Sequence, residues 1–214
     1  MSQNLPKEAF MMEKFNINLS QERCFLNLQY FFKQQVSVYG KKYKTDDEQS
    51  ECLNEIASWL VETKGKWGLL LAGVTGNGKT ITVKAMRTFV NACKITDPIP
   101  TIGTWTLNAG IWMINARELN KMFVKDNATF EKCKDTYILA IDDLGVEDTI
   151  VYWEGNRYKP MEDILYYRYE RMLTTIVTTN LPLAMIREKY GDRLGDRFNE
   201  MFLIIHMPDR NFRN

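Results

Sequence analysis

Residues 69–82 read LLLAGVTGNGKTIT, and this stretch decides the fold. It contains the pattern G-x-x-x-x-G-K-[ST], with Gly73, Gly78, Lys79 and Thr80 at the defining positions. The leucine run before the pattern predicts a buried strand, and the apolar spacing after it predicts a helix. A strand, a glycine-rich loop and a helix in this order are typical of a phosphate-binding loop (P-loop), and make a chance glycine-rich turn the poorer explanation.

The residue types of this loop suit a nucleoside triphosphate. Glycines let backbone N–H groups turn towards phosphate oxygens, and the start of the following helix adds its positive dipole end. The Lys79 ammonium can reach the β- and γ-phosphates, and the Thr80 hydroxyl can be a ligand of Mg²⁺. We therefore expect ATP and Mg²⁺ at this loop. The expected nucleotide-binding residues are Gly73, Thr75, Gly76, Asn77, Gly78, Lys79, Thr80 and Ile81.

A second motif follows about sixty residues later, where the apolar run YILAI at 137–141 ends in Asp142 and Asp143. On a parallel strand beside the P-loop, the Asp142 carboxylate would hold Mg²⁺, directly or through water. The Asp143 carboxylate could orient or deprotonate the attacking water. A turn that merely ends a strand is the alternative explanation of the pair.

Two later segments add polar candidates. The β-branched run at 174–178 ends in a polar cluster that includes Thr179 and Asn180, although an asparagine in the turn before a proline is common on its own. Further on, Arg193 and Arg197 lie four residues apart and share one face if the segment is helical. The planar guanidinium of arginine suits the negative charge that is spread over a phosphate group. Alternatively, the two arginines could form ion pairs with the acidic residues between them on a solvent-exposed face of the helix.

The remaining pattern predicts an α/β protein. Strands are expected at 68–72, 111–115, 137–141, 174–178 and 202–206, and helices near 79–94, 116–126, 160–172 and 182–200, the last broken at Gly191. Alternation of apolar strands with helices predicts a parallel sheet that is covered on both faces. Segments 97–110 and 145–160 are expected to be loops. Upstream, helices are expected to begin after Ser20 and after Thr45 or Asp46, whose side chains can cap them.

Composition excludes several classes of protein. The 214 residues carry 28 Lys and Arg against 27 Asp and Glu, so the chain is no polycation and should bind nucleic acid only modestly. The four cysteines are too far apart for a zinc site or a disulfide framework, and His206 reads as a structural residue of a strand. No apolar run approaches the roughly 20 residues that span a bilayer, and no secretion signal opens the chain, so we expect no membrane partner and a cytoplasmic location.

The order of these motifs resembles the AAA+ ATPases of the DnaC/IstB type, which are bacterial and phage helicase loaders and transposition helper ATPases. The resemblance covers about residues 50–214. It rests on the P-loop and on the runs IDDLG at 141–145, RYE at 168–170, TTNL at 178–181, YGDR at 190–193, DR at 196–197 and DRNFR at 209–213.

This resemblance implies a P-loop AAA+ core with a five-stranded, mainly parallel sheet between helices, preceded by a short helical N-terminal segment. It implies that Asn180, with Thr179 as the near alternative, is the sensor 1 residue that fixes the lytic water. It also implies that Arg197, with Arg193 beside it, is the arginine finger acting on a neighbour's ATP. Arg213 would be the sensor 2 arginine, which contacts bound nucleotide in its own subunit.

We therefore expect residues 1–45 to be a helical segment that binds a partner, and residues 46–214 to be the ATPase domain. By the resemblance, the first hypothesis is a replicative helicase loader that hydrolyses ATP, forms a homo-oligomer when ATP is bound, and binds single-stranded DNA weakly. The second is a transposition helper ATPase that assembles on duplex DNA. The third is a nucleotide-gated assembly adaptor that barely hydrolyses ATP.

Overall fold

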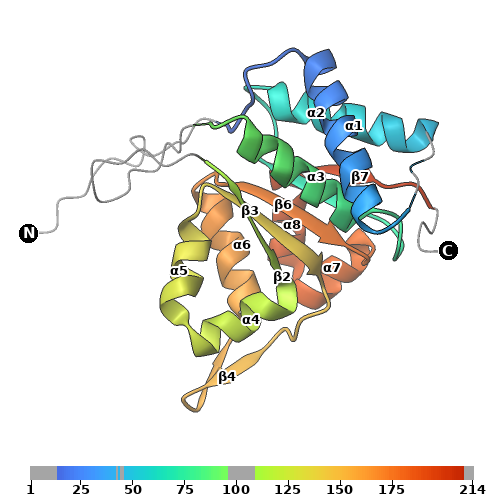
Figure 1. Cartoon of the computed structure of the whole chain (residues 1–214). Helices are drawn as coiled ribbons and strands as arrows, with labels where there is room; N and C mark the ends of the chain where they lie inside the picture. The colour runs from blue at the N-terminus through green and yellow to red at the C-terminus, as the bar shows by residue number, and fades with distance from the viewer. Residues whose placement is uncertain (1–13, 42, 44–45, 96–108, 210–214) are drawn as a thin grey trace, which may run out of the picture.

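The computed structural model describes residues 14–41, 43, 46–95 and 109–209 (Figure 1). Within these ranges the chain alternates between strands and helices downstream of two N-terminal helices. In chain order the elements are α1 (Gln21–Val38), α2 (Asp47–Val61), β1 (Gly68–Ala72), α3 (Lys79–Ala92), β2 (Ile111–Asn115), α4 (Ala116–Lys125), α5 (Asn127–Asp135), β3 (Ile138–Leu144), β4 (Val151–Trp153), β5 (Asn156–Tyr158), α6 (Pro160–Glu170), β6 (Thr174–Thr179), α7 (Leu183–Tyr190), α8 (Asp192–Met201) and β7 (Phe202–His206).

The main sheet has five strands in the order β2-β3-β6-β1-β7, and every neighbouring pair is parallel. The expected fold class, a P-loop core built on a five-stranded parallel sheet, is therefore confirmed. The register places Ala72 beside Thr179 and Asn115 beside Asp142, so these strands end at one edge of the sheet. The P-loop leaves the sheet at this edge.

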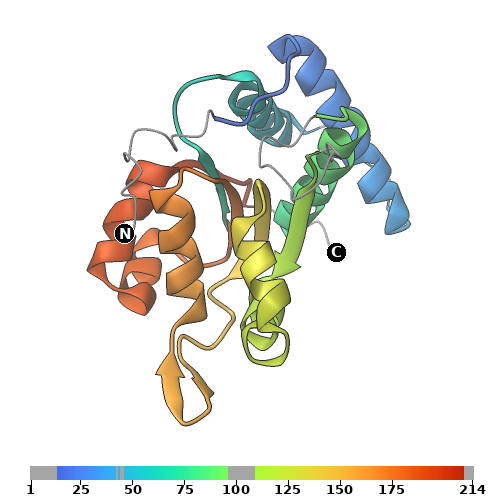
Figure 2. The same cartoon turned by 90° about the vertical axis from the view of Figure 1, so that its left-hand side faces the viewer.

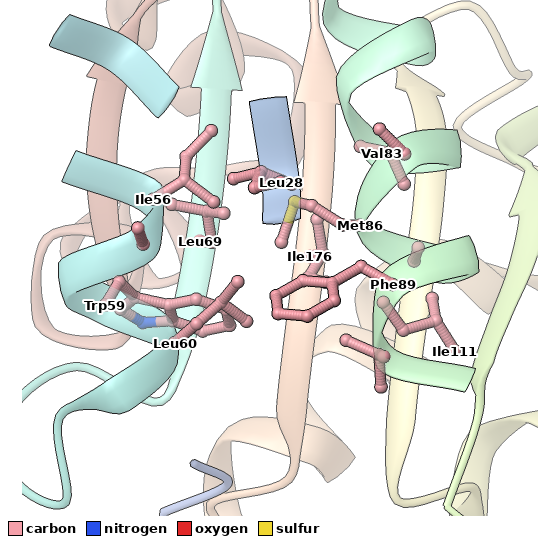
Figure 3. Packing of buried hydrophobic residues seen from close by; sticks show 14 of the residues in the cluster. Leu28, Ile56, Trp59, Leu60, Leu69, Val83, Met86, Phe89, Ile111 and Ile176 are labelled. Atoms are coloured by element: carbon pink, nitrogen blue, oxygen red, sulfur yellow. The ribbon is translucent and has the colours of Figure 1, made fainter. Parts of the chain in front are cut away.

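Helices cover both faces of the sheet (Figures 1 and 2). Side chains of β1 alternate between the two layers, because successive residues of a strand point to opposite faces. Leu69 and Leu71 pack in the core shared with α1, α2 and α3, whereas Leu70 packs in the core shared with α4 to α8. Figure 3 shows the first of these cores, where Leu28, Ile56 and Phe89 close over Leu69 and Ile176.

Both N-terminal helices begin at residues whose side chains satisfy free N–H groups of the first turn. Ser20 accepts from the Arg23 N–H and Asp46 accepts from the Gln49 N–H; Thr45, the other expected cap, lies outside the described residues. The buried face of α1 joins α2 and α3 in one core, through Cys24, Leu28 and Phe32. The division of the chain at residue 45 stays a prediction.

Two elements were not expected from the sequence. A short helix, α5, follows α4, and a hairpin of β4 and β5 occupies part of the segment expected to be a loop. The expectation of a loop over 145–160 is therefore wrong at 151–158. Phe123 of α4 explains the hairpin: its ring lies 5.6 Å from the ring of Trp153 and 5.2 Å from that of Tyr158. Most of the expected segment 97–110 lies outside the described residues.

Candidate nucleotide-binding site

A cavity of about 310 Å³ opens where the P-loop meets the carboxyl edge of the sheet. The P-loop, the ends of β3 and β6 and the segment after α1 contribute its walls. The lining residues are Tyr39, Lys41, Thr75, Gly76, Asn77, Gly78, Lys79, Thr80, Ile81, Asp142, Asp143 and Asn180. The two sequence motifs and the end of the 174–180 run thus come together in space.

Gly73 is the expected P-loop residue that does not line this cavity. Its role is steric, because a Cβ there would lie 2.3 Å from Asn77 Nδ2 and its φ of +145° disfavours other residues. Gly78 has φ of +94° at the first turn of α3, where it lets the loop pass directly into the helix. These two positions fix the shape of the loop.

The Lys79 side chain is buried and held by the loop's own oxygens. Its Nζ donates to Gly73 O at 2.7 Å, to Val74 O at 2.8 Å and to Asn77 Oδ1 at 2.9 Å. The ammonium therefore lies inside the ring of backbone that it would share with phosphate oxygens. The expectation of Lys79 at the phosphates fits this position, although the side chain is less exposed than a surface loop would suggest.

The Thr80 hydroxyl and the Asp142 carboxylate lie side by side in the wall of the cavity, within hydrogen-bond distance of each other. Thr80 Oγ1 lies 3.0 Å from one carboxylate oxygen and 3.2 Å from the other, and Thr178 Oγ1 donates to the same group at 2.7 Å. A hydroxyl and a carboxylate are oxygen ligands of the kind that Mg²⁺ takes together with phosphate oxygens and water. Within the described ranges no cluster of three His, Cys, Asp or Glu side chains is placed to hold a metal ion.

Asp143 has a different setting from Asp142. Its φ is +58°, a conformation that aspartate tolerates, and its N–H donates to Thr178 Oγ1 at 2.9 Å. Its carboxylate lies 3.5 Å from the amide nitrogen of Asn115, at the end of β2. The two neighbouring carboxylates thus point to different partners, as the separate roles of metal ligand and water activator require. Sequence reasoning missed Asn115, which has no motif of its own.

The structure separates the two candidates at the end of β6. Thr179 is fully buried, and its hydroxyl donates to Leu144 O at 2.8 Å and accepts from the Leu181 N–H at 3.0 Å. Asn180 is exposed and lines the cavity. Of the two, Asn180 is therefore the one placed to contact a bound nucleotide or water.

Tyr39 and Lys41 also line the cavity, and sequence reasoning did not single them out. Tyr39 is the C-cap residue of α1, and Lys41 follows two residues later. The Lys84 ammonium of α3 donates to Tyr39 Oη at 2.6 Å and lies 5.3 Å from the centre of its ring. The N-terminal segment thus reaches the cavity and is attached beside the P-loop helix.

The two arginines of α8 lie outside the cavity. Arg197 is bonded to both carboxylate oxygens of Glu200 at 2.9 Å, and its guanidinium lies 5.0 Å from the centre of the Tyr169 ring. Arg193 lies 4.9 Å from the centre of the Tyr166 ring. Arg197 is thus salt-bridged and Arg193 lies over an aromatic ring, and the action of both on a neighbour's nucleotide stays a prediction. Arg213 lies outside the described residues.

A third arginine, Arg168, has a structural role that the sequence did not reveal. It is fully buried in α6, and its Nε donates to Thr175 Oγ1 at 2.9 Å. Its two terminal nitrogens donate to four backbone carbonyls, those of Lys134, Thr136, Tyr137 and Thr174, which lie at the end of α5 and the starts of β3 and β6. Burial lowers the pKa of this guanidinium. Arg168 therefore joins the two strands that carry Asp142 and Asn180.

The fold and the cavity define a class. A strand, β6, lies between the P-loop strand β1 and the strand β3 that ends in carboxylates, and this insertion is the mark of the additional-strand P-loop proteins, to which the AAA+ fold belongs. No helix in the described part of the chain is long and apolar enough to cross a membrane.

We compared the chain with known proteins to find which additional-strand P-loop proteins its fold is most similar to. No family model and no curated protein matches the sequence. Among solved structures, DnaI matches with a TM-score of 0.59 and 19% identity, over 84% of this chain and 94% of DnaI. The DnaC helicase loader matches with a TM-score of 0.51 and 19% identity, over 96% of this chain and 98% of the other. AMPPCP-bound DnaA from Aquifex aeolicus matches with a TM-score of 0.54 and 16% identity, over 80% of this chain and 50% of DnaA.

These structural matches confirm the resemblance to DnaC-type AAA+ proteins that the sequence motifs indicated, at the level of the fold. The chain has a DnaC-like AAA+ fold, and its best matches among these structures extend over nearly the whole length of both chains.

Proposed function

We propose that this chain binds and hydrolyses MgATP, and that it uses this cycle as a replicative helicase loader. The observation that carries the proposal is the meeting of Lys79, Thr80, Asp142, Asp143 and Asn180 around one cavity. A P-loop alone would support only phosphate binding, whereas two carboxylates with different partners support hydrolysis. AMPPCP held by the DnaA of similar fold supports ATP as the ligand.

Each residue has a definable part in the reaction. Lys79 would exchange its loop acceptors for oxygens of the β- and γ-phosphates. Thr80 and Asp142 would hold Mg²⁺, whose charge offsets the negative charge of the phosphate oxygens. Asp143 would accept the proton of the attacking water, and Asn180 would orient that water towards the γ-phosphate. The products are ADP and inorganic phosphate.

Assembly supplies the remaining group. Arg197, with Arg193 beside it, would leave its ion pair with Glu200 and contact the γ-phosphate of a neighbouring subunit. Arg213 would contact the nucleotide of its own subunit. We therefore propose a homo-oligomer in the ATP-bound state, with single-stranded DNA bound weakly and mainly by the assembled form, since a chain of net charge +1 releases few counterions.

The helicase is proposed as the partner because the matched DnaC structure is that of a helicase loader and aligns with 96% of this chain. We assign its binding to residues 1–45, ahead of an ATPase domain at 46–214. Within that segment α1 exposes Leu26, Tyr30 and Val38, whose relative accessibilities are 55%, 57% and 76%. Exposed apolar side chains of this size favour a protein contact. A replication role also favours a cytoplasmic location.

The test is a loading assay with the full chain, the replicative helicase of the same cell and single-stranded DNA. ATP should raise the amount of helicase on DNA, and Lys79→Ala should abolish the increase. Loading that does not depend on this protein would contradict the loader hypothesis. ATP binding without turnover, with DNA and helicase present, would instead support an assembly adaptor, and ATP-dependent assembly on duplex DNA would support a transposition helper.

A further inference from the structure

Glu147 is a buried carboxylate four residues after Asp143, and no motif singled it out. Its side chain is fully buried. One carboxylate oxygen accepts from the Gly145 N–H at 2.8 Å; the other accepts from the Tyr190 hydroxyl and lies 3.8 Å from Lys189 Nζ. Its partners thus come from two places, the loop after β3 and the last turn of α7.

Lys189 ties the same two places together a second time. Its ammonium donates to Gly145 O and to Glu147 O, each at 2.6 Å. Burial and the nearby Glu147 carboxylate raise the pKa of Tyr190, so its hydroxyl stays a donor to that carboxylate. The loop is therefore bonded to α7 through two of its carbonyls and the Glu147 carboxylate, and the Gly145 N–H holds that carboxylate from within the loop.

Burying the Glu147 carboxylate costs desolvation free energy that an apolar side chain in the same place would not cost. Apolar side chains of similar volume would give comparable or better stability, because removing a carboxylate from water is costly even when it is paired. A directed set of hydrogen bonds gives instead one defined position of the loop. This contrast points to a requirement for geometry at the loop rather than for packing.

The residues on either side of the Glu147 hydrogen-bond network indicate why the position of this loop matters. Asp143, two residues before Gly145, lines the nucleotide cavity. Gly145 has φ of +105°, and a Cβ there would lie 2.4 Å from the Leu181 side chain, so the loop has little freedom to adjust. On the other side, α7 passes through Gly191 directly into α8, which carries Arg193 and Arg197.

We propose that Glu147 is a positioning residue for ATP hydrolysis: through Gly145, Lys189 and Tyr190 it fixes the loop that directly follows Asp143 and the end of β3 to the joint between α7 and α8. The inference rests on the proposed function and extends it. Engagement of α8 by a neighbouring subunit would then act on the orientation of Asp143 through this joint. The group that touches the water remains Asp143, and Glu147 acts through it.

The test compares Glu147→Gln with Glu188→Gln in the full-length protein. Both variants remove one negative charge, but Glu188 is an exposed residue of α7. Three quantities are measured: the thermal midpoint, the Kd for a fluorescent ATP analogue with Mg²⁺, and turnover at saturating ATP over a range of protein concentrations. For Glu147→Gln we expect a Kd within about twofold of wild type and turnover about tenfold lower, at every protein concentration. Glu188→Gln should match wild type in all three.

Tyr190→Phe keeps the ring and removes one donor, and it serves if Glu147→Gln does not fold. It should lower turnover with unchanged Kd, and adding Glu147→Gln to it should lower turnover less than the product of the two single effects. Wild-type turnover in folded Glu147→Gln or Tyr190→Phe would overturn the inference, as would a Kd that weakens in proportion to turnover, because that pattern indicates a purely structural role. Wild-type protein that binds ATP no better than Lys79→Ala would instead refute the proposed function.

Discussion

Lys79→Ala removes the one side chain that bonds both to the P-loop and, in the proposed function, to the phosphates. In the free chain its Nζ has three acceptors at 2.7, 2.8 and 2.9 Å. The alanine variant leaves these oxygens without that donor, so the variant should lose stability as well as affinity.

Both effects can be sized. Leaving buried acceptors unpaired costs about 1–3 kcal/mol, which for a chain of this length lowers the unfolding midpoint by about 2–4 °C per kcal/mol. A charge-assisted hydrogen bond to phosphate contributes about 1.5–3 kcal/mol, or about 10–150-fold in Kd. Lys79 must give up its loop acceptors to reach the phosphates, and this loss offsets part of the gain. We therefore expect the Kd for ATP to rise by about tenfold, at the lower end of that range.

The assay is a titration with a fluorescent ATP analogue in excess Mg²⁺, with thermal unfolding measured on the same samples. Arg87→Ala is the matched control, since it removes an exposed cation from the same helix. It should leave both the Kd and the midpoint unchanged. An ATP affinity of Lys79→Ala equal to that of wild type would refute the assignment of the P-loop, whatever happened to the stability.

Four further variants test other parts of the structure. Asp142→Asn should weaken the Mg²⁺ dependence of ATP binding, whereas Asp143→Asn should keep the affinity and lower turnover by about 100-fold or more; identical behaviour of the two would refute their separate roles. Arg168→Met should lower the free energy of unfolding by about 3–5 kcal/mol in a urea titration, because it leaves four carbonyls without their donor, and an unchanged urea midpoint would contradict that role. Lys41→Ala should weaken ATP binding by a few-fold, by about 1 kcal/mol, without lowering the thermal midpoint; unchanged affinity would remove Lys41 from the site.

The strands were the most predictable part of the fold. The structure has β1, β2 and β7 at the residues that the apolar runs indicated. Strand β1 is buried throughout and so leaves a continuous apolar signal, whereas the edge strands β2 and β7 are only partly buried but still apolar in most positions. Strand β3 runs on to Leu144, through the polar pair, with a register shift between Ile141 and Leu144 that the composition of the run does not reveal.

The missed elements depend on contacts between distant residues. Only Phe130 and Cys133 of α5 are buried, too few to give a helical period. The strands of the hairpin have three residues each, and their order comes from the ring of Phe123, about thirty residues upstream.

The residues of the candidate site likewise fall into two groups, those that the sequence predicted and those that only the folded structure brings together. The P-loop and the carboxylates could be predicted because the chemistry needs contiguous residues at fixed spacing. Tyr39, Lys41 and Asn115 could not, since they lie far from the motifs in the sequence: Tyr39 and Lys41 reach the cavity from the end of α1, and Asn115 meets Asp143 from the end of β2. Arg168 belongs to a run that carries the family resemblance and Glu147 belongs to no motif, but the burial of neither could be predicted, because a charged side chain in a sequence predicts exposure until its partners are known.

The central claim is that ATP is hydrolysed at this cavity with help from an arginine of a neighbouring subunit. The most direct test mixes Arg197→Ala, which should bind ATP normally and hydrolyse it poorly, with Lys79→Ala, which should bind ATP about tenfold more weakly and also hydrolyse it poorly. We predict that turnover in the mixture exceeds the sum of the separate activities, because the intact Arg197 of one subunit serves the intact P-loop of the other, and that wild-type turnover per subunit rises with protein concentration. A mixture no more active than that sum, with wild-type turnover per subunit independent of concentration, would contradict the claim and leave Arg197 as a surface charge paired with Glu200.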